Sequence, residues 1–378
     1  MNETTRRVEY TTEQALYLAF ELSKGRWKLA FSTGLGQKPR RRSMDAGDLL
    51  VLQQEIMLAK RRFRLPEAVP VRSCYEAGRD GFWLHRYLLE TKIENLVVDS
   101  SSIEVDRRAK RAKTDRIDVG KLLNMLIRYH SGEQKMWRVV HVPSVEAEDK
   151  RHLHRQLSTF KADRTRHICR IKGLLATQGL DLPIHVDFLE TLEAARLWDG
   201  SCLPPGLRGR VAREHAALRF VQQQIKALEA ERDELIETSD DPSVVKVRQL
   251  MKLRAIGPTS AWLFVMEFFG WRQFRNRREV GGLAGLTPTP HQSGEESREQ
   301  GISKAGNRLV RAIAIEIAWC WLRYQPDSEL SLWFYKNFGH GGKRMRKVGI
   351  VALARKLLVA LWRYLETGEI PAGAQLKP

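Results

Sequence analysis

The chain of 378 residues carries 64 Lys and Arg against 45 Asp and Glu, which gives a formal net charge of +19. Hydrophobic residues make up 43% of it, enough for folded cores, so a wholly disordered chain is excluded. The length suggests two or three domains. So large a positive excess indicates a polyanionic partner, with nucleic acid as the first candidate and an anionic membrane surface as the second.

No apolar segment is long enough to cross a bilayer. The best candidate, Leu309–Trp321, contains Arg311 and Glu316 and is shorter than the ~18 residues that a span needs. Residues 1–14 are polar, so no signal peptide is predicted. The four cysteines are far apart and form no CxxC pair, which argues against a zinc site or a disulfide framework. We expect a cytoplasmic protein that has no membrane partner.

The first part of the chain, residues 1–143, alternates between strand and helix patterns. Short apolar or alternating runs predict strands over 16–21, 26–31, 40–44, 69–75 and 93–98. Helical periodicity predicts a helix capped by Asp45 and running to about Phe63, and further helices over 82–90 and 115–129. This order predicts a mixed sheet with helices packed on it, which is an α/β domain.

Four acidic residues stand at the ends of these elements. Glu21 ends the first strand, Glu76 ends the fourth, and Asp115 and Asp118 open the last helix on one face. Carboxylates that converge at one sheet edge need cations, and hard oxygen ligands suit Mg²⁺ or Mn²⁺. Two such ions about 4 Å apart can hold a phosphodiester and polarise its bonds. Taken singly, each acid is more simply a solvated strand end, or a helix N-cap for Asp115, so the prediction depends on all four.

A basic run precedes the aspartate pair. It contains Arg107, Arg108, Lys110, Arg111 and Lys113. Such a run is either a solvated loop or a segment that holds a phosphate backbone beside the acidic residues. Both interpretations stay open at this point.

The middle of the chain, residues 144–245, has two helical stretches over 145–177 and 211–236 with heptad-like apolar spacing. They predict an antiparallel helical hairpin or coiled coil, with ordinary helix packing as the alternative. The first stretch is strongly basic, which predicts a nucleic-acid-binding surface, and the second has mixed charge, which suits packing or dimerisation. The basic residues of the first stretch are Lys150, Arg151, Arg155, Lys161, Arg164, Arg166, Arg170 and Lys172.

The last part of the chain, residues 246–378, is mostly helical by pattern. Leu250–Trp271 resembles a helix-hairpin-helix around Ile256-Gly257-Pro258, although a plain helix-helix turn fits equally well. Residues 280–294 are rich in Gly and Pro and predict a shaped loop. The helices expected over 309–324 and 348–365 are apolar on most faces, so their tryptophans, and Trp333 between them, are more simply core residues than base-stacking ones.

Ser293 lies in the Gly- and Pro-rich loop. A serine in a loop is usually a turn or cap residue. A serine that attacks a phosphodiester must instead be exposed, activated and surrounded by cations, and here Arg298, Lys304 and Arg308 follow within 15 residues. A basic run over 343–347 is either a further phosphate contact or the start of a helix.

Several of these segments together resemble a known family. Ala19-Phe20-Glu21, Tyr75-Glu76-Ala77-Gly78 and Lys113-Thr114-Asp115-Arg116-Ile117-Asp118 look like the three acidic motifs of the Asp-Glu-Asp-Asp (DEDD) insertion-sequence transposases. Gly285-Leu286-Thr287-Pro288, Gln292-Ser293-Gly294 and Ile302–Asn307 look like landmarks of that family's C-terminal transposase domain. The chain departs from the family pattern at its first acid, which is Glu21 where the family has Asp.

The resemblance implies an RNase H-like (RuvC-like) fold for residues 1–143 and a C-terminal transposase domain whose nucleophile is Ser293. It implies that Glu21, Glu76, Asp115 and Asp118 bind Mg²⁺ or Mn²⁺. It also implies donor and target DNA and a non-coding guide (bridge) RNA as partners, and a homodimer or homotetramer in a bacterial or archaeal cytoplasm. The expected activity is RNA-guided DNA recombination through a phosphoserine intermediate.

Two other functions stay open on the sequence. One is a metal-dependent, structure-specific endonuclease that uses water, resembling a Holliday-junction resolvase. The other is a nucleic-acid-binding protein without cleavage activity, because the extra methylene of Glu21 moves the carboxylate by about 1 Å, enough to cost two orders of magnitude in rate.

Overall fold

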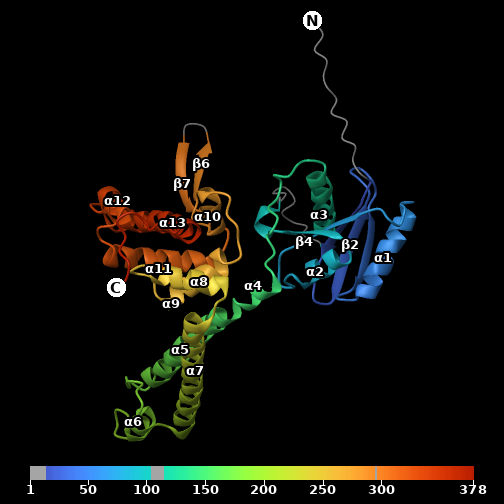
Figure 1. Ribbon diagram of the computed structural model, residues 1–378. Coiled ribbons are helices and arrows are strands. Elements are labelled where there is room, and N and C mark those ends of the chain that lie inside the picture. The colour runs from blue at the N-terminus through green and yellow to red at the C-terminus, as the bar shows by residue number, and fades with distance from the viewer. Residues whose placement is uncertain (1–13, 104–114, 294–295) are drawn as a thin grey trace. The chain divides into compact units, whose positions relative to one another are not determined.

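The computed structural model describes residues 14–103, 115–293 and 296–378, and for 115–118, 290–293 and 296–300 it describes the backbone alone. The chain divides into two compact units, Met1–Val142 and Pro143–Pro378 (Figure 1). The segments 144–245 and 246–378 both lie in the second unit.

The first unit is built on a five-stranded mixed sheet of order β3-β2-β1-β4-β5. β1 pairs antiparallel with β2 and parallel with β4, β2 pairs antiparallel with β3, and β4 pairs parallel with β5. The five strand predictions are confirmed, and β1 is the central strand. The strands are β1 (Leu16–Glu21), β2 (Arg26–Ser32), β3 (Arg40–Asp45), β4 (Val71–Glu76) and β5 (Glu94–Val98).

Helices cover both faces of this sheet. Because side chains alternate along a strand, Leu16, Leu18 and Phe20 of β1 join the core under α1 (Leu49–Arg62) and α2 (Trp83–Glu90). Tyr17 and Ala19 join the core under α3 (Asp115–His130). A short 3-10 helix, η1 (Ser100–Ser102), follows β5. The expected α/β domain is confirmed.

The start of α1 differs from the sequence prediction. Asp45 does not cap this helix, because it is the last residue of β3 and pairs with Arg26 across the β2–β3 ladder. The cap is Asp48, whose carboxylate accepts a hydrogen bond from the backbone N–H of Val51 at 3.0 Å. The intervening residues form a turn, so the helix starts three positions later than its sequence pattern indicated.

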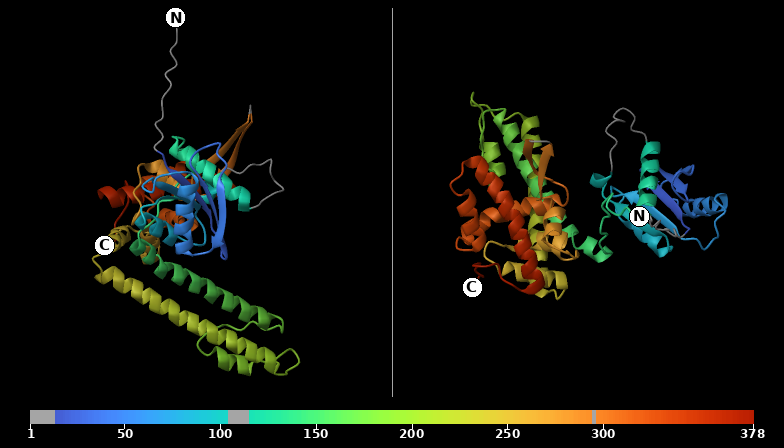
Figure 2. Two further views of the ribbon diagram at one scale, coloured as in Figure 1. Left: turned by 90° about the vertical axis from the view of Figure 1, so that its right-hand side faces the viewer. Right: turned by 90° about the horizontal axis from the view of Figure 1, so that it is seen from above.

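The second unit begins with a helical hairpin. The predicted helix over 145–177 is broken into α4 (Val145–Asp149) and α5 (His152–Ala176). The short α6 (Phe188–Ala194) follows, and α7 (Pro205–Thr238) returns along α5 (Figure 2, left). Leu157 of α5 packs against Val221 and Ile225 of α7. The pair is antiparallel, and its description as a coiled coil stays a prediction.

The remaining elements of the second unit enclose one large apolar core. α9 runs directly into a π-helical turn, η3. The elements are α8 (Pro242–Met251), α9 (Pro258–Phe264), η3 (Val265–Phe269), α10 (Arg277–Leu283), β6 (Pro288–Ser293), β7 (Glu296–Ile302), α11 (Arg308–Tyr324), α12 (Glu329–Phe338) and α13 (Lys343–Thr367).

The loop predicted over 280–294 is wrong in part. Its first residues belong to α10, and its last ones form β6, which pairs with β7 in a two-stranded hairpin. Only the segment between α10 and β6 keeps the irregular backbone that Gly and Pro favour. The predicted helix-hairpin-helix region forms α8 and α9 with Gly257 between them, and its contact with phosphate stays a prediction.

None of the helices in the described ranges is long and apolar enough to cross a bilayer.

Candidate functional site

The carboxyl ends of β1 and β4 bring two of the predicted acidic residues together. The strands are parallel and paired up to Phe20 and Tyr75, so Glu21 and Glu76 follow at neighbouring positions on strands about 4.8 Å apart. Ala19 and Cys74 face α3, and alternation puts Glu21 and Glu76 on that same face. Glu76 is exposed and Glu21 is half-buried. Two carboxylates thus share one edge and one face of the sheet.

The direction of α3 places the aspartate pair at the same edge. His130 at its C-terminal end contacts Tyr17 near the start of β1, with ring centroids 5.9 Å apart. The carbonyl of Leu122 accepts a 3.8 Å hydrogen bond from the Cys74 thiol in mid-strand. Asp118 is one turn earlier, about 6 Å back along the helix, and Glu76 is two residues after Cys74, about 6.6 Å along the strand. The backbone positions of Asp115 and Asp118 are therefore at the end of the sheet that carries Glu21 and Glu76.

These four positions fit oxygen-ligated cations, because the donors are all carboxylates and come from three different elements. Among the residues whose side chains are described, no group of three or more His, Cys, Asp or Glu is placed to hold a metal ion, and that set does not include Asp115 and Asp118. Their side chains, and the whole basic run with Arg107, Arg108, Lys110, Arg111 and Lys113, lie outside the described residues.

The foot of the β6–β7 hairpin is held by a close crossing of two backbones. Gly285 has φ +70°, and a Cβ there would come 2.1 Å from the carbonyl oxygen of Ala305. Gly306 has φ +100°, and its Cβ would come 2.1 Å from the carbonyl oxygen of Leu283. Only glycine fits at both points. Two of the three segments that carry the family resemblance at this end of the chain, 285–288 and 302–307, therefore pack on one another at the foot of the hairpin.

Ser293 is the last residue of β6 and pairs with Glu296 across the tip of the hairpin. Arg298 lies opposite His291 on β7, Lys304 is exposed at the foot of the hairpin, and Arg308 is the exposed first residue of α11. The side chains of Ser293 and Arg298 lie outside the described part of the structure, so their chemical roles stay predictions.

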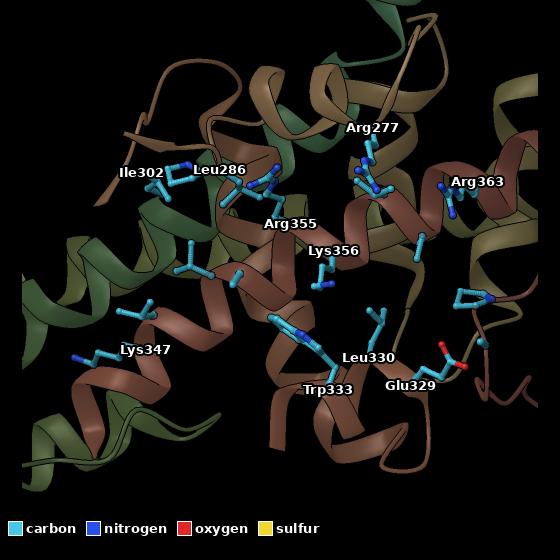
Figure 3. A pocket seen from close by; sticks show the side chains of 18 of the residues that line it. Arg277, Leu286, Ile302, Glu329, Leu330, Trp333, Lys347, Arg355, Lys356 and Arg363 are labelled. Atoms are coloured by element: carbon cyan, nitrogen blue, oxygen red, sulfur yellow. The ribbon is translucent and has the colours of Figure 1, made fainter. Parts of the chain in front are cut away.

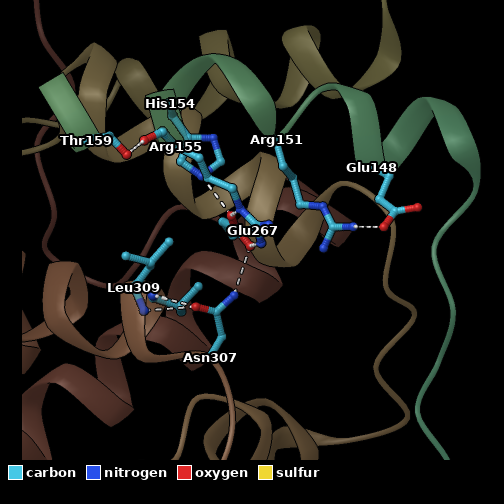
Figure 4. A network of polar contacts seen from close by, with 9 residues as sticks. Glu148, Arg151, His154, Arg155, Thr159, Glu267, Asn307 and Leu309 are labelled. Atoms are coloured by element: carbon cyan, nitrogen blue, oxygen red, sulfur yellow. Dashed lines mark hydrogen bonds and ion pairs between the residues drawn. The ribbon is translucent and has the colours of Figure 1, made fainter. Parts of the chain in front are cut away.

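A buried acid, Glu267, connects this region to α5 (Figure 4). It lies on η3 and is fully buried. It accepts hydrogen bonds from Arg155 Nε at 2.6 Å and Arg155 NH2 at 3.0 Å, contacts His154 Nε2 at 2.8 Å, and accepts from Asn307 Nδ2 at 3.0 Å. The oxygen of the Asn307 amide caps α11 through the N–H groups of Leu309 and Val310.

Burial alone would raise the pKa of the Glu267 carboxyl. The hydrogen bonds from His154 and Arg155 and the charge of the guanidinium outweigh that effect and lower the pKa to about 2. Glu267 is therefore charged throughout the physiological range, and it ties α5 to the loop that precedes α11. Glu267 was not predicted as a functional residue from the sequence. The signal that could have indicated it is its position as a lone acid in the apolar run Phe264–Phe269.

The eight basic residues predicted as a nucleic-acid surface on the first helical arm are largely paired within the chain. Lys150, Arg151 and Arg155 pair with Asp241, Glu148 and Glu267. Lys161 pairs with Glu229 and Arg170 with Glu214, both on α7, and Arg166 pairs with Asp163. For Arg164 and Lys172 no ion pair is formed with the described acidic side chains. Arg155 pairs with a buried acid, but the more exposed pairs of Lys161, Arg166 and Arg170 open at little cost. Nucleic-acid binding by α5 therefore stays a prediction.

A second basic surface lines a groove of about 1050 Å³ along one face of α13 (Figure 3). Pro288, Gly301 and Ile302 at the foot of the hairpin form part of its wall. Apart from Arg344 and Lys347 in the 343–347 run, its basic residues were missed in the sequence. The available signal was the spacing of basic and small apolar residues at intervals of three and four along α13. The basic lining residues are Arg277, Arg344, Lys347, Arg355, Lys356 and Arg363.

Comparison with known proteins places this arrangement in a class. Residues 247–331, which include Glu267, Ser293 and Asn307, match the model of the family described as "Transposase IS116/IS110/IS902 family". Over 376 residues, 96% of this chain and 95% of the other, the chain is 40% identical to "Putative transposase y4rJ" of Sinorhizobium fredii.

More distant relatives have the same kind of name. The chain is 24% identical over 221 residues to "Transposase for insertion sequence element IS1328" of Yersinia enterocolitica, covering 58% of this chain and 63% of that one. It is 25% identical over 235 residues to "Transposase for insertion sequence element IS1111A" of Coxiella burnetii, covering 61% and 62%. The protein is a DNA transposase, an enzyme of DNA recombination. It belongs to the IS116/IS110/IS902 family of insertion-sequence transposases.

Proposed function

We propose that this transposase cuts and rejoins DNA through attack of Ser293 on a phosphodiester, and that the first unit supplies a cation-binding acidic centre. The observation that carries the proposal is the meeting of Glu21 and Glu76 at the ends of parallel β1 and β4, under the helix that Asp115 and Asp118 open. The five-stranded mixed sheet with helices on both faces supports an RNase H-like assignment for this unit.

The four carboxylates would hold Mg²⁺ or Mn²⁺. When bound, such ions would neutralise the charge of the carboxylates and polarise a phosphate. The chain's own contribution is to fix the oxygen donors on a rigid sheet edge and one helix. Glu21 and Glu76 are set by the β1–β4 register, and Asp115 and Asp118 by the packing of Leu122 over Cys74.

Ser293 is the proposed nucleophile. Its hydroxyl loses a proton as the Oγ–phosphorus bond forms, and the bond from phosphorus to the 3′ oxygen breaks, which leaves a phosphoserine and a free 3′-hydroxyl. In the rejoining step a 3′-hydroxyl from the other DNA attacks the phosphoserine and releases the serine. The position of Ser293 at the tip of the β6–β7 hairpin supports this role, whereas Lys304 and Arg308 are exposed beyond the foot of the hairpin and would contact the nucleic acid at a distance from the serine.

We further propose that a non-coding guide RNA pairs with donor and target DNA and selects the sites. Two properties of the sequence support this proposal. The net charge of +19 suits contacts with the phosphate backbone of nucleic acids, and the sequence identifies no element that would read base edges. Donor DNA, target DNA and RNA are then all held through their phosphates, by a homodimer or homotetramer.

Covalent trapping tests the nucleophile. Purified protein is incubated with labelled DNA carrying the insertion junctions, the cognate RNA and Mg²⁺, and adducts are resolved on denaturing gels. We expect wild type to give a protein–DNA adduct and Ser293→Ala to give none while RNA binding is retained. Ser303→Ala is the matched control and keeps the adduct. An adduct that persists in Ser293→Ala contradicts the assignment.

Removal of one carboxylate tests the acidic centre. We expect Asp118→Asn to abolish Mg²⁺-dependent cleavage and adduct formation, because the amide cannot replace a charged ligand, while binding of DNA and RNA is unchanged. Undiminished cleavage by Asp118→Asn contradicts the proposed centre. Cleavage without any adduct in wild type would instead identify a nuclease that uses water, and binding without cleavage would identify a binding protein.

A further inference from the structure

The groove along α13 is a continuous surface formed within the second unit. Its α13 residues, from Arg344 to Arg363, recur at steps of three and one and so lie on one helix face. They span about 28 Å at the helical rise of 1.5 Å per residue. α12 and the segment after α13 form the opposite wall, and the foot of the β6–β7 hairpin forms one side.

The charge in this groove is strongly unbalanced. Six basic side chains line it, against the acids Glu329 and Glu369. Among the described side chains, none of the six has an ion pair or a hydrogen bond to an acid, in contrast to six of the eight cations on and beside α5. Like charges held together without counter-charges repel one another, so this arrangement costs stability unless an anion occupies the groove.

Much of the remaining lining is apolar, and this apolar surface favours a single strand of nucleic acid over a duplex. Leu286, Ile302, Leu330, Val351 and Val359 contribute carbon surface between the cations. A duplex presents phosphates and sugars on its outside and would leave this surface uncovered. A single strand offers phosphates on one side and unpaired bases on the other, and the bases cover apolar and aromatic side chains.

At the centre of the groove a cation lies against an aromatic ring. Trp333 from α12 and Lys356 from α13 point toward one another (Figure 3), and Lys356 Nζ lies 4.5 Å from the indole centroid. A nucleotide matches such a pair, because its phosphate suits the ammonium group and its base suits the indole. An acidic amphipathic helix would satisfy the charge and the apolar wall, but it gives no particular reason for the aromatic–cation pair at the centre.

The geometry points to a single-stranded nucleic-acid site in the α13 groove, with phosphates held by Arg344, Lys347 and Arg363 and bases packed against Trp333 and its aliphatic neighbours. The site deepens the proposed function, on which it rests in one respect: the groove leads to the foot of the hairpin whose tip carries Ser293. A single strand of DNA freed during cutting is the occupant that this position favours.

Fluorescence anisotropy tests the site with the full chain in the absence of Mg²⁺, so that cleavage does not enter the measurement. The probe is a labelled oligothymidylate of about 20 nucleotides, and its abasic and duplex counterparts are compared over a range of salt. The variant Arg344→Gln/Lys347→Gln removes two groove cations. The matched control Lys343→Gln/Arg346→Gln removes two exposed cations from the same helical turn, outside the groove, with the same change in net charge.

We expect the groove variant to bind oligothymidylate about tenfold more weakly at moderate salt. We also expect the plot of the log of the binding constant against log salt to become less steep by about 1.4, that is, by ~0.7 for each of two phosphates. The control is expected to change binding by less than about twofold. Equal losses in the two variants would overturn the groove, because only total charge would then matter.

A second variant tests the bases. Trp333→Leu keeps an apolar side chain and every cation but removes the aromatic ring, and we expect it to weaken binding of oligothymidylate about tenfold and of the abasic strand hardly at all. Thermal melting checks that the variant is folded. Equal effects on both probes, or an acidic amphipathic peptide that binds the groove while the oligonucleotide does not, would overturn the site. Loss of the adduct in Ser293→Ala is independent of all these results, so the two proposals fail separately.

Discussion

The basic residues of α5 and of α13 look alike in the sequence and differ in the structure. Six of the eight named cations on and beside α5 have an acidic partner within 4 Å, and three of these partners lie on α5 or α7. None of the six cations in the α13 groove has one among the described side chains. A count of basic residues therefore measures charge that is present, whereas binding depends on charge that is not already neutralised.

The difference has a physical origin in what each helix packs against. α5 lies along α7, whose acids Glu214 and Glu229 face it, so its cations stabilise the hairpin. α13 lies with its apolar face in the main core, and the acids among the described residues that line the groove are Glu329 and Glu369. We expect α5 to be mainly a structural arm and α13 to be the main source of available positive charge in the second unit.

The largest effect is expected where the pairing on α5 is buried. Glu267→Ala leaves Arg155, His154 and Asn307 without their shared acceptor, and removal of one partner from a buried ion pair costs about 3–5 kcal/mol of unfolding free energy. Arg363→Gln in the groove removes a cation that has no acidic partner and should change stability by less than about 0.5 kcal/mol. Urea unfolding of both variants measures the two losses of unfolding free energy. Similar losses for Glu267→Ala and Arg363→Gln would contradict the proposed difference between the α5 and α13 cations.

The stabilisation that Glu267 provides should also depend on pH. The pKa of Glu267 in the folded protein is about 2, below its ordinary value of 4.5, so its stabilising contribution is complete above about pH 4.5 and is lost as the pH falls toward 2. The difference corresponds to about 3 kcal/mol. Glu267→Gln has no such titration, so the difference in unfolding free energy between wild type and this variant should shrink over that range. A difference that is independent of pH would contradict the lowered pKa.

Much of the first unit could be predicted from the sequence. Strand periodicity located β1 to β5, and the placing of Glu21 and Glu76 at strand ends followed from it directly. The sequence did not predict that Glu21 and Glu76 are neighbours, because this depends on the direct parallel pairing of β4 with β1. The cap of α1 was misplaced since Asp45 and Asp48 are equally good capping residues, and only the length of β3 decides between them.

The second unit was harder to predict for the same kind of reason. Gly285 and Gly306 indicated irregular backbone, but their purpose is a crossing between segments 20 residues apart that no local pattern encodes. Likewise the pairing of Arg155 with Glu267 joins positions far apart in the chain. The α13 groove needs the hairpin foot, α12 and the C-terminal segment together. Tertiary packing, not local propensity, decides which charges are neutralised.

The smallest effect is expected when exposed paired cations are removed from α5. Lys161→Gln/Arg170→Gln lowers the net charge by two, as the groove variant does, but each lost cation also frees an acid, Glu229 or Glu214. We expect binding of the single-stranded probe to weaken by about threefold or less, because these cations are partly neutralised already, and stability to change by about 1 kcal/mol or less. Anisotropy under the conditions used for the groove variant gives the comparison. A loss on α5 as large as on α13 would mean that the ion pairs open on binding, and α5 would then be a nucleic-acid surface equal to the groove.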